Sequence, residues 1–408
     1  MKALICVGLW LRVLGAAAKY KVYLEFYGGF ADSGVYYRMG LQYAEAFRQL
    51  DFSSLFDASG WHGGSWVGTQ SIYFLSGGVM TFLGTSMVAE YIVFSLFAFV
   101  GIMGFAIAFR SAYPGVPWTR YLRWILLFPS IWFWTATVGK EAVLMMGLGI
   151  AVRGFIGRRG RVNWALLVIG TFFVYAVRVQ VAGILLGSMV AAQWLSRGGR
   201  WTVGRIVQGA VLLVVGLAGV SLSMQSVGIE EFGVEGVQEY VETDPSRTTA
   251  GGTNVDAVSP SLTGIPMAAF NILFRPLPWE ATNVMVLLAS LEIFAFWAIA
   301  LGRGKNLLRA LRHWRSDRFL ALAIIFTLVY AVGLGMMVIN LGIIARQRVL
   351  VFPFLFILLE AWPKPMARRR RRPQHVGRRV PARRRSPTYA HGNARQAAPS
   401  TLGWRGTG

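Results

Sequence analysis

Long apolar stretches separated by short polar segments dominate the chain. They lie at residues 3–18, 88–109, 124–138, 142–156, 164–177, 180–195, 206–224, 281–301, 319–338 and 349–362. A helix needs about 20 residues to cross roughly 30 Å of hydrocarbon, so the shorter stretches must thin the bilayer, use flanking residues or stop partway. The pattern predicts an all-α fold, a polytopic transmembrane helical bundle of about ten spans within residues 1–362.

Two apolar segments allow a second interpretation. Residues 3–18 follow Lys2 and end in three alanines, the layout of a secretory signal, but Arg12 within the apolar core favours an uncleaved first helix. The stretch Thr69–Ser86 contains Gly77-Gly78 and fits a re-entrant or interfacial segment better than a span. Counting it as a span would also place the basic segment 110–123 on the outer side.

The polar segment 19–87, the first outer loop, has helical periodicity of its own. After Asp32, the apolar and aromatic positions recur at helical spacing, which predicts an interfacial amphipathic helix up to Leu50; they are Val35, Tyr36, Met39, Tyr43 and Phe47. Asp32 then lies near the helix N-terminus, where a carboxylate caps free amides and is favoured by the dipole. Capping and catalysis both remain interpretations of Asp32.

The composition supports a membrane protein, and the charges orient it. The 408 residues are 55% hydrophobic and only 14% charged, with a formal net charge of +23. Thirty of the 41 basic residues fall at Lys2, in the segments 110–123, 153–161, 197–205 and 303–318, and after Pro363, where Asp317 is the one acid. Because Lys and Arg collect in cytoplasmic loops, both termini are predicted to be cytoplasmic.

Two polar segments, the C-terminal tail and a large loop, lie on opposite sides of the membrane in this topology. Residues 363–408 are rich in Arg and Pro and are predicted to form a disordered cytoplasmic tail near anionic membrane lipids. No aromatic residues lie within the arginine runs 368–372 and 383–385, so nucleic acid is not expected as a partner. The large outer loop 225–280 contains an acidic stretch from Glu230 to Asp256, which fits a solvated loop or a lid.

The topology gathers most of the reactive side chains on the outer face. Gly139-Lys140-Glu141 lies between two short apolar runs, so its charges either pair with each other or serve function, with Lys140 recognising phosphate. Arg178 interrupts a long apolar stretch near its middle and predicts two short helices with an outward turn. Its anionic partner is Glu141, a lipid phosphate or backbone carbonyls.

Three further arginines complete the predicted outer site. Arg275 stands between Phe274 and Pro276, a stiff segment with interfacial aromatics that suits either a lipid-phosphate clamp or a membrane anchor. Arg346 and Arg348 precede the last apolar stretch and alternate, so they need not share a helix face. They either contact phosphate or extend to the membrane surface.

An arginine in the first helix, an aspartate early in the first outer loop and a tyrosine four residues later resemble the polytopic glycosyltransferases of the GT-C fold. Those enzymes take sugars from polyprenyl-phosphate donors at the outer membrane face. The resemblance implies that Asp32 is a general base or a metal ligand near the acceptor hydroxyl, and that Tyr36 or Tyr37 lines the site.

A second resemblance is to multi-span proteins of bacterial surface-polysaccharide clusters. It rests on Phe128 to Glu141, Phe274 to Glu280 and Asn340 to Arg348. The chain departs from well-known GT-C enzymes because it has no Asp-x-Asp pair, no soluble C-terminal domain and no histidine near the late motifs. No cofactor is predicted, no metal ligands are assigned, and a divalent cation is left open.

These observations predict a transferase of the bacterial cell membrane acting on a polyprenyl-phosphate-linked sugar or oligosaccharide at the outer face, in cell-surface glycan assembly. Asp32 and Glu141 are the candidate catalytic carboxylates. The candidate substrate contacts are Tyr36, Tyr37, Lys140, Arg178, Arg275, Arg346 and Arg348. A polymerase or ligase of preassembled lipid-linked glycan, a flippase for the same lipid, and a scaffold of an assembly complex are the alternatives. Partners are the lipid-linked sugar and other polysaccharide-assembly proteins.

Overall fold

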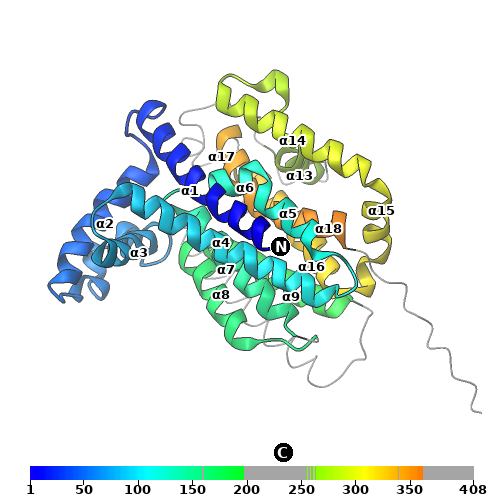
Figure 1. Ribbon diagram of the computed structural model, residues 1–408, viewed down its shortest axis with the longest axis horizontal. Helices are drawn as coiled ribbons and strands as arrows, with labels where there is room; N and C mark the ends of the chain where they lie inside the picture. The colour runs from blue at the N-terminus through cyan, green and yellow to red at the C-terminus, as the bar shows by residue number, and fades with distance from the viewer. Residues whose placement is uncertain are drawn as a thin grey trace, which may run out of the picture. The chain divides into compact units, whose positions relative to one another are not determined.

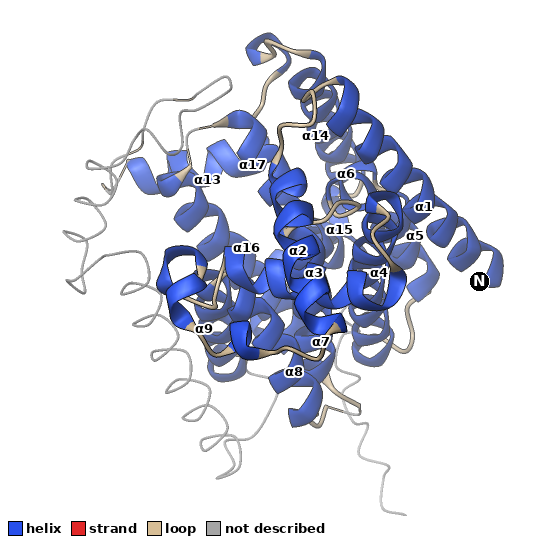
Figure 2. Ribbon diagram, turned by 90° about the vertical axis from the view of Figure 1, so that its left-hand side faces the viewer, coloured by secondary structure: helices blue, strands red, loops and turns tan. Residues whose placement is uncertain are grey.

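The computed structural model describes residues 1–158, 160–196, 263–338 and 340–361, together with positions 255, 258 and 261. Every regular element of these residues is a helix (Figure 2), and an isolated bridge joins Arg158 to Arg161. The all-α prediction is therefore confirmed for the described part of the chain. The apolar stretch 206–224, most of the acidic stretch before Asp256 and the tail 363–408 lie outside it.

The helices follow one another in the order shown in Figure 1. The α-helices are α1 (Lys2–Glu25), α2 (Asp32–Arg48), α3 (Thr69–Leu83), α4 (Met87–Ala112), α5 (Trp118–Leu127), α6 (Pro129–Trp134), α7 (Lys140–Ile156), α8 (Trp164–Val177), α9 (Val179–Leu195), α13 (Gly264–Phe274), α14 (Val284–Gly302), α15 (Gly304–His313), α16 (Arg318–Met337), α17 (Leu341–Gln347) and α18 (Phe352–Glu360). The 3-10 turns are η1 (Ser53–Leu55), η2 (Ala58–Gly60), η3 (His62–Gly64), η4 (Pro278–Glu280), η5 (Trp314–Ser316) and η6 (Arg348–Leu350).

Four described helices are long and apolar enough to cross a membrane: α1, α4, α14 and α16. A fifth span results if η6, α17 and α18 are counted as one segment bent by 53°. The other predicted apolar stretches among the described residues also form helices, but these are shorter. The structure thus supports a membrane protein with four or five such helices, and the count of about ten spans stays a prediction.

The breaks between short helices have local causes. The apolar run 124–138 does not form a single helix. Pro129 interrupts it, because proline lacks the amide that would continue α5, and Pro129 instead occupies the first position of α6. Arg178, with extended backbone, separates α8 from α9. The two short helices predicted around Arg178 are therefore confirmed.

The core of the bundle depends on close helix packing. α4 packs against α7, and α7 packs against α8. Glycines make these approaches feasible: a Cβ atom on Gly101 of α4 would lie 2.0 Å from the carbonyl oxygen of Met145 in α7. Small residues allow this kind of backbone contact between membrane helices. All nine residues of α18 are buried within the bundle.

Within the segment 19–87, α2 and α3 form a helical hairpin, seen at the left of Figure 1. The amphipathic helix predicted after Asp32 is α2, and its predicted inner face includes the buried Tyr36 and Phe47, whereas Val35 is exposed. Gly40 faces Ser76 and Gly77 at close range. α3 has 15 residues and is not among the helices long enough to span. Its interfacial or re-entrant placement stays a prediction.

Candidate functional site

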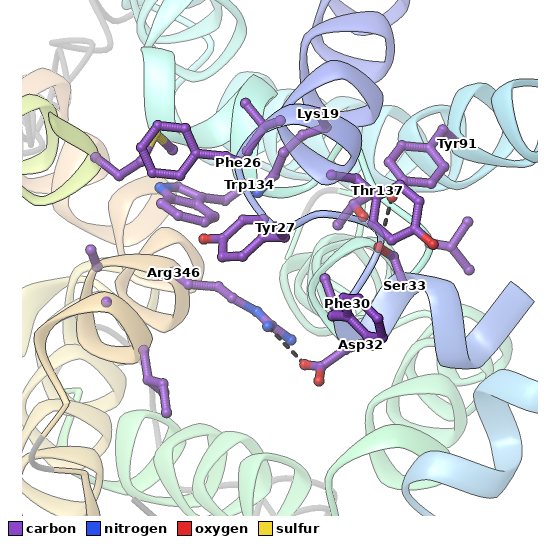
Figure 3. A pocket seen from close by; sticks show the side chains of 18 of the residues that line it. Lys19, Phe26, Tyr27, Phe30, Asp32, Ser33, Tyr91, Trp134, Thr137 and Arg346 are labelled. Atoms are coloured by element: carbon purple, nitrogen blue, oxygen red, sulfur yellow. Dashed lines mark hydrogen bonds and ion pairs between the residues drawn. The ribbon is translucent and has the colours of Figure 1, made fainter. Parts of the chain in front are cut away.

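A cavity of about 550 Å³ lies where the C-terminal end of α1, the start of α2, α6, the start of α14 and α17 come together (Figure 3). Its volume is in the range of small-molecule binding sites. Aromatic side chains make up much of the wall, including Tyr27, Phe30 and Trp134. Three charged residues line it: Lys19, Asp32 and Arg346.

Local sequence explains how Asp32 reaches this cavity. Gly28 and Gly29 adopt positive φ angles of 55° and 82°, which glycine accepts without strain, and they turn the chain after α1. Ala31 is the extended N-cap of α2, and no side chain caps this helix end. Asp32 is the first helical residue, so its carboxylate does not act as the cap that was one interpretation of the sequence.

The Asp32 carboxylate instead begins a ladder of ion pairs. Arg346 Nη1 lies 3.0 Å from Asp32 Oδ2, an ion pair marked by a dashed line in Figure 3, and Arg346 Nε lies 2.9 Å from Glu141 Oε1. Arg178 Nη2 lies 3.2 Å from the same oxygen of Glu141. The ladder connects four segments that are far apart in sequence: the start of α2, α17, the start of α7 and the α8–α9 turn.

Exposure differs sharply along the ladder. The Asp32 side chain is 63% exposed, Arg346 is 28% exposed and Glu141 is fully buried. Burial disfavours the charged form of Glu141, but the guanidinium groups of Arg346 and Arg178 outweigh it and lower the pKa of Glu141. Glu141 is therefore a buried anion that orients Arg346, and Asp32 is the carboxylate accessible to a ligand.

The N-terminal cap of α17 fixes the position of Arg346. The side chain of Asn340 accepts hydrogen bonds from the amides of Gly342 and Ile343, at 2.9 and 3.1 Å, and so caps α17. Both Asn340 and Gly342 line the cavity. One turn later Arg346 projects toward Asp32 and Glu141.

Two lysines add positive charge near the ladder. Lys19 Nζ lies 4.0 Å from the ring centroid of Trp134 and 4.5 Å from that of Phe133, and no ion pair joins it to a described carboxylate. Lys140 does not pair with Glu141 but donates a hydrogen bond of 3.0 Å to Thr69 Oγ1. The mutual Lys140–Glu141 pair, one interpretation of the sequence, is not what the structure contains.

Tyr36 and Tyr37 separate because they point in different directions from α2. Tyr36 is buried and lines the cavity, where desolvation and the nearby Asp32 raise its pKa, so the phenol stays neutral. Tyr37 donates a hydrogen bond of 2.6 Å to the carbonyl of Thr85 and is not a lining residue. The structure thus brings one of the two candidate tyrosines to the cavity.

Arg275 and Arg348 also lie elsewhere. Arg275 is held by Glu280, with 2.7 Å from Nε to Oε1, and by Asn271 at 3.2 Å. Arg348 is fully buried and donates to the carbonyls of Ile272 and Arg275 at the end of α13. Neither lines the cavity. Both arginines hold the backbone around α13 in place.

The charge balance of the site favours an anion. Around the cavity and its ladder stand four basic side chains, Lys19, Lys140, Arg178 and Arg346, against the acids Asp32 and Glu141, which leaves a formal net charge of +2. A phosphate group seated between Lys19 and Arg346 would be neutralised there. The sequence did not single out Lys19 as a site residue, because it entered only the count of charges that orients the helices. Its position directly after the first apolar stretch, 3–18, was the signal that could have identified it.

In the part of the chain that the structure describes, no group of three or more His, Cys, Asp and Glu side chains could hold a metal ion. The divalent cation left open by the sequence therefore has no assigned ligand set. No protein-family model matches the chain, and neither the curated proteins nor the solved structures contain a match to it.

Proposed function

We propose that this chain is a membrane transferase that takes a sugar or oligosaccharide from a polyprenyl-phosphate carrier at the outer face of a bacterial cell membrane. The observation that carries the proposal is one cavity that holds an accessible carboxylate, Asp32, beside two cations, Lys19 and Arg346, within aromatic walls. A general base and phosphate-binding cations are the groups that such a transfer needs.

The proposed step is a displacement at the sugar carbon that carries the phosphate. Asp32 accepts the proton of the acceptor hydroxyl, the hydroxyl oxygen forms a bond to that carbon, and the carbon–oxygen bond to the carrier phosphate breaks. The departing phosphate keeps the electron pair, and Arg346 and Lys19 neutralise its charge. Arg346 can serve both groups because it already contacts Asp32.

The walls of the cavity support a lipid-linked donor. Residues of α1 and α14, two of the helices long enough to cross a membrane, contribute to the lining. Both helices also expose large apolar side chains, among them Trp10 and Leu14 on α1 and Leu287 and Leu288 on α14. A polyprenyl tail can lie along these surfaces while its phosphate reaches the cavity.

The wider setting belongs to the same proposal. We place about ten spans in a GT-C-like bundle, both termini in the cytoplasm, and the protein among other components of cell-surface polysaccharide assembly. The basic residues after Pro363 then face anionic lipids. A divalent cation is not required by the proposed step.

The test is transfer by the purified full-length chain in lipid vesicles, with polyprenyl-phosphate-linked and polyprenyl-diphosphate-linked sugars as donors. Asp32→Asn should lower the transfer rate at least 100-fold, the usual scale for loss of a general base. Glu45→Gln is the matched control, because Glu45 is an exposed carboxylate on the same helix. Equal rates in the two variants would contradict the role of Asp32.

The same vesicles separate the alternatives. A polymerase or ligase would use only preassembled oligosaccharide donors, with no transfer from single-sugar donors. A flippase would move the intact lipid-linked sugar across the bilayer without changing it. Movement without transfer, unaffected by Asp32→Asn, would overturn the proposed reaction.

A further inference from the structure

A second cavity, of about 640 Å³, lies between α5 and α14 at the α5–α6 junction. Its rim carries three arginines: Arg120 and Arg123 from α5 and Arg303 from the end of α14. Its wall is largely apolar and includes Leu291, Ala295 and Ile299 of α14. The spacing of these wall positions, four residues apart in each case, puts them on one face of the helix.

The two cavities lie toward opposite ends of α14. The first cavity is lined by Asn283, Met285 and Val286 at the start of the helix, and the second is lined by Arg303, directly after its last residue. Twenty residues of helix rise about 30 Å, the thickness of the hydrocarbon core of a bilayer. From Leu291 to Arg303 the rise is about 18 Å, which is close to the depth of one leaflet. With α14 crossing the membrane, as proposed above, the second cavity belongs to the half opposite the first cavity.

Its charge is only partly compensated within the protein. Arg303 pairs with Glu360, which also accepts a hydrogen bond of 2.7 Å from Trp124. Arg120 and Arg123 are exposed, and neither forms an ion pair or side-chain hydrogen bond with another described residue.

The one acid in the lining, Glu292, is already engaged. It accepts hydrogen bonds from the backbone amide of Ser130, at 2.5 Å, and from the Ser130 hydroxyl at the start of α6. The rim of the cavity is consequently cationic, and its wall is apolar. A ligand that complements both parts has an anionic head and a hydrocarbon tail.

We propose that this second cavity binds an anionic phospholipid of the leaflet opposite the first cavity. Arg120, Arg123 and Arg303 contact its phosphate, and one acyl chain follows Leu291, Ala295 and Ile299. Charge complementarity selects this occupant, because arginine offers a planar fork to phosphate oxygens. The site lies on the side that positive charge marks as cytoplasmic, where anionic lipids attract basic residues. It is independent of the transfer reaction.

The test measures lipid binding to the full-length protein by native mass spectrometry, with phosphatidylglycerol and phosphatidylcholine as probes. Two lost charges at about 1 kcal/mol each correspond to roughly a 30-fold weaker affinity. The double variant Arg120→Gln/Arg123→Gln should show this loss for phosphatidylglycerol. The matched control, Arg153→Gln/Arg158→Gln, removes two exposed arginines from the same predicted side and should change the affinity less than threefold.

A variant that keeps every charge tests the acyl-chain wall. Ala295→Trp places an indole in the cavity and should also abolish the tight site. Equal losses in the two double variants, with no effect of Ala295→Trp, would mean general surface attraction and would overturn the proposal. Displacement of the bound lipid by millimolar inorganic phosphate would equally overturn it, because the site would then take a soluble anion. Equal affinity for phosphatidylcholine would exclude selection by charge.

Discussion

The sharpest structural prediction concerns Glu141, the buried centre of the ion-pair ladder. Glu141→Gln keeps the shape of the side chain and removes its charge. Arg346 and Arg178 lie 2.9 and 3.2 Å from its Oε1 atom, with side-chain exposures of 28% and 13%. The substitution leaves both guanidinium groups without this partner. Arg346 retains Asp32, whereas Arg178 retains no carboxylate among the described residues.

The magnitude follows from two opposing terms. Unit charges about 4 Å apart attract by roughly 4 kcal/mol at an effective dielectric constant of 20, so two contacts supply about 8 kcal/mol. Desolvation of the buried carboxylate costs several kcal/mol, and breaking a buried pair by removing one partner costs about 3–5 kcal/mol in measured cases. Because both arginines are partly exposed, we expect Glu141→Gln to lower the free energy of unfolding by about 3 kcal/mol, the lower end of that range.

Unfolding in mixed detergent micelles measures this loss as a change in free energy. Glu45→Gln, an exposed carboxylate on α2, should stay within about 0.5 kcal/mol of the natural protein. The double variant Glu141→Gln/Arg178→Gln should be less destabilised than the sum of the two single variants, because it removes both charges. A loss under 1 kcal/mol for Glu141→Gln would refute the reasoning, since desolvation would then cancel the ion pairs.

The same residue predicts a pH dependence. Burial opposes ionisation, but Arg346 and Arg178 lower the pKa of Glu141 from 4.5 to about 2. A carboxylate with a lowered folded-state pKa stabilises the protein above its unfolded value, and that contribution is lost as the pH falls from about 4.5 toward 2. The natural protein should lose stability over this window, and Glu141→Gln should lose less.

Two further predictions concern packing and topology. Gly101→Ala should destabilise the bundle by about 3 kcal/mol, because its Cβ would meet a carbonyl oxygen of α7 at 2.0 Å, whereas Gly187→Ala, with nothing within 4 Å, should be neutral or stabilising in the same unfolding assay. In a Cys6→Ser background, a membrane-impermeant thiol reagent should label Phe30→Cys and not Leu301→Cys in intact cells. Both natural side chains are highly exposed, at 90% and 80%, and the reverse labelling would invert the predicted topology.

Much of the helical layout could be predicted from hydrophobic periodicity. The apolar stretches within the described residues, the helix starting at Asp32 and the interruption at Arg178 all depend on local sequence, and the structure contains each of them. The break between α5 and α6 at Phe128-Pro129 was not predicted, because the apolar run continues on both sides of it. Proline at that position was the local signal.

The site could be predicted only as a set of outer-face residues. Arg346 and Arg348 are two residues apart, yet one reaches Asp32 and Glu141 and the other is fully buried against α13. That difference depends on partners more than 70 residues away, and local pattern contains no information on them. The predicted topology assigned Asp32, Glu141, Arg178 and Arg346 to one side of the membrane, and tertiary packing determines which of them are in contact.

The central claim, that a lipid-linked phosphate occupies the cavity between Lys19 and Arg346, is tested most directly by mapping crosslinks of a photoreactive polyprenyl diphosphate by mass spectrometry. The account predicts crosslinks to lining residues such as Tyr27, Trp134 and Ile343, and their loss in Arg346→Gln but not in Arg38→Gln, an exposed arginine on α2. Crosslinks confined to outward-facing apolar residues, unchanged in Arg346→Gln, would contradict it.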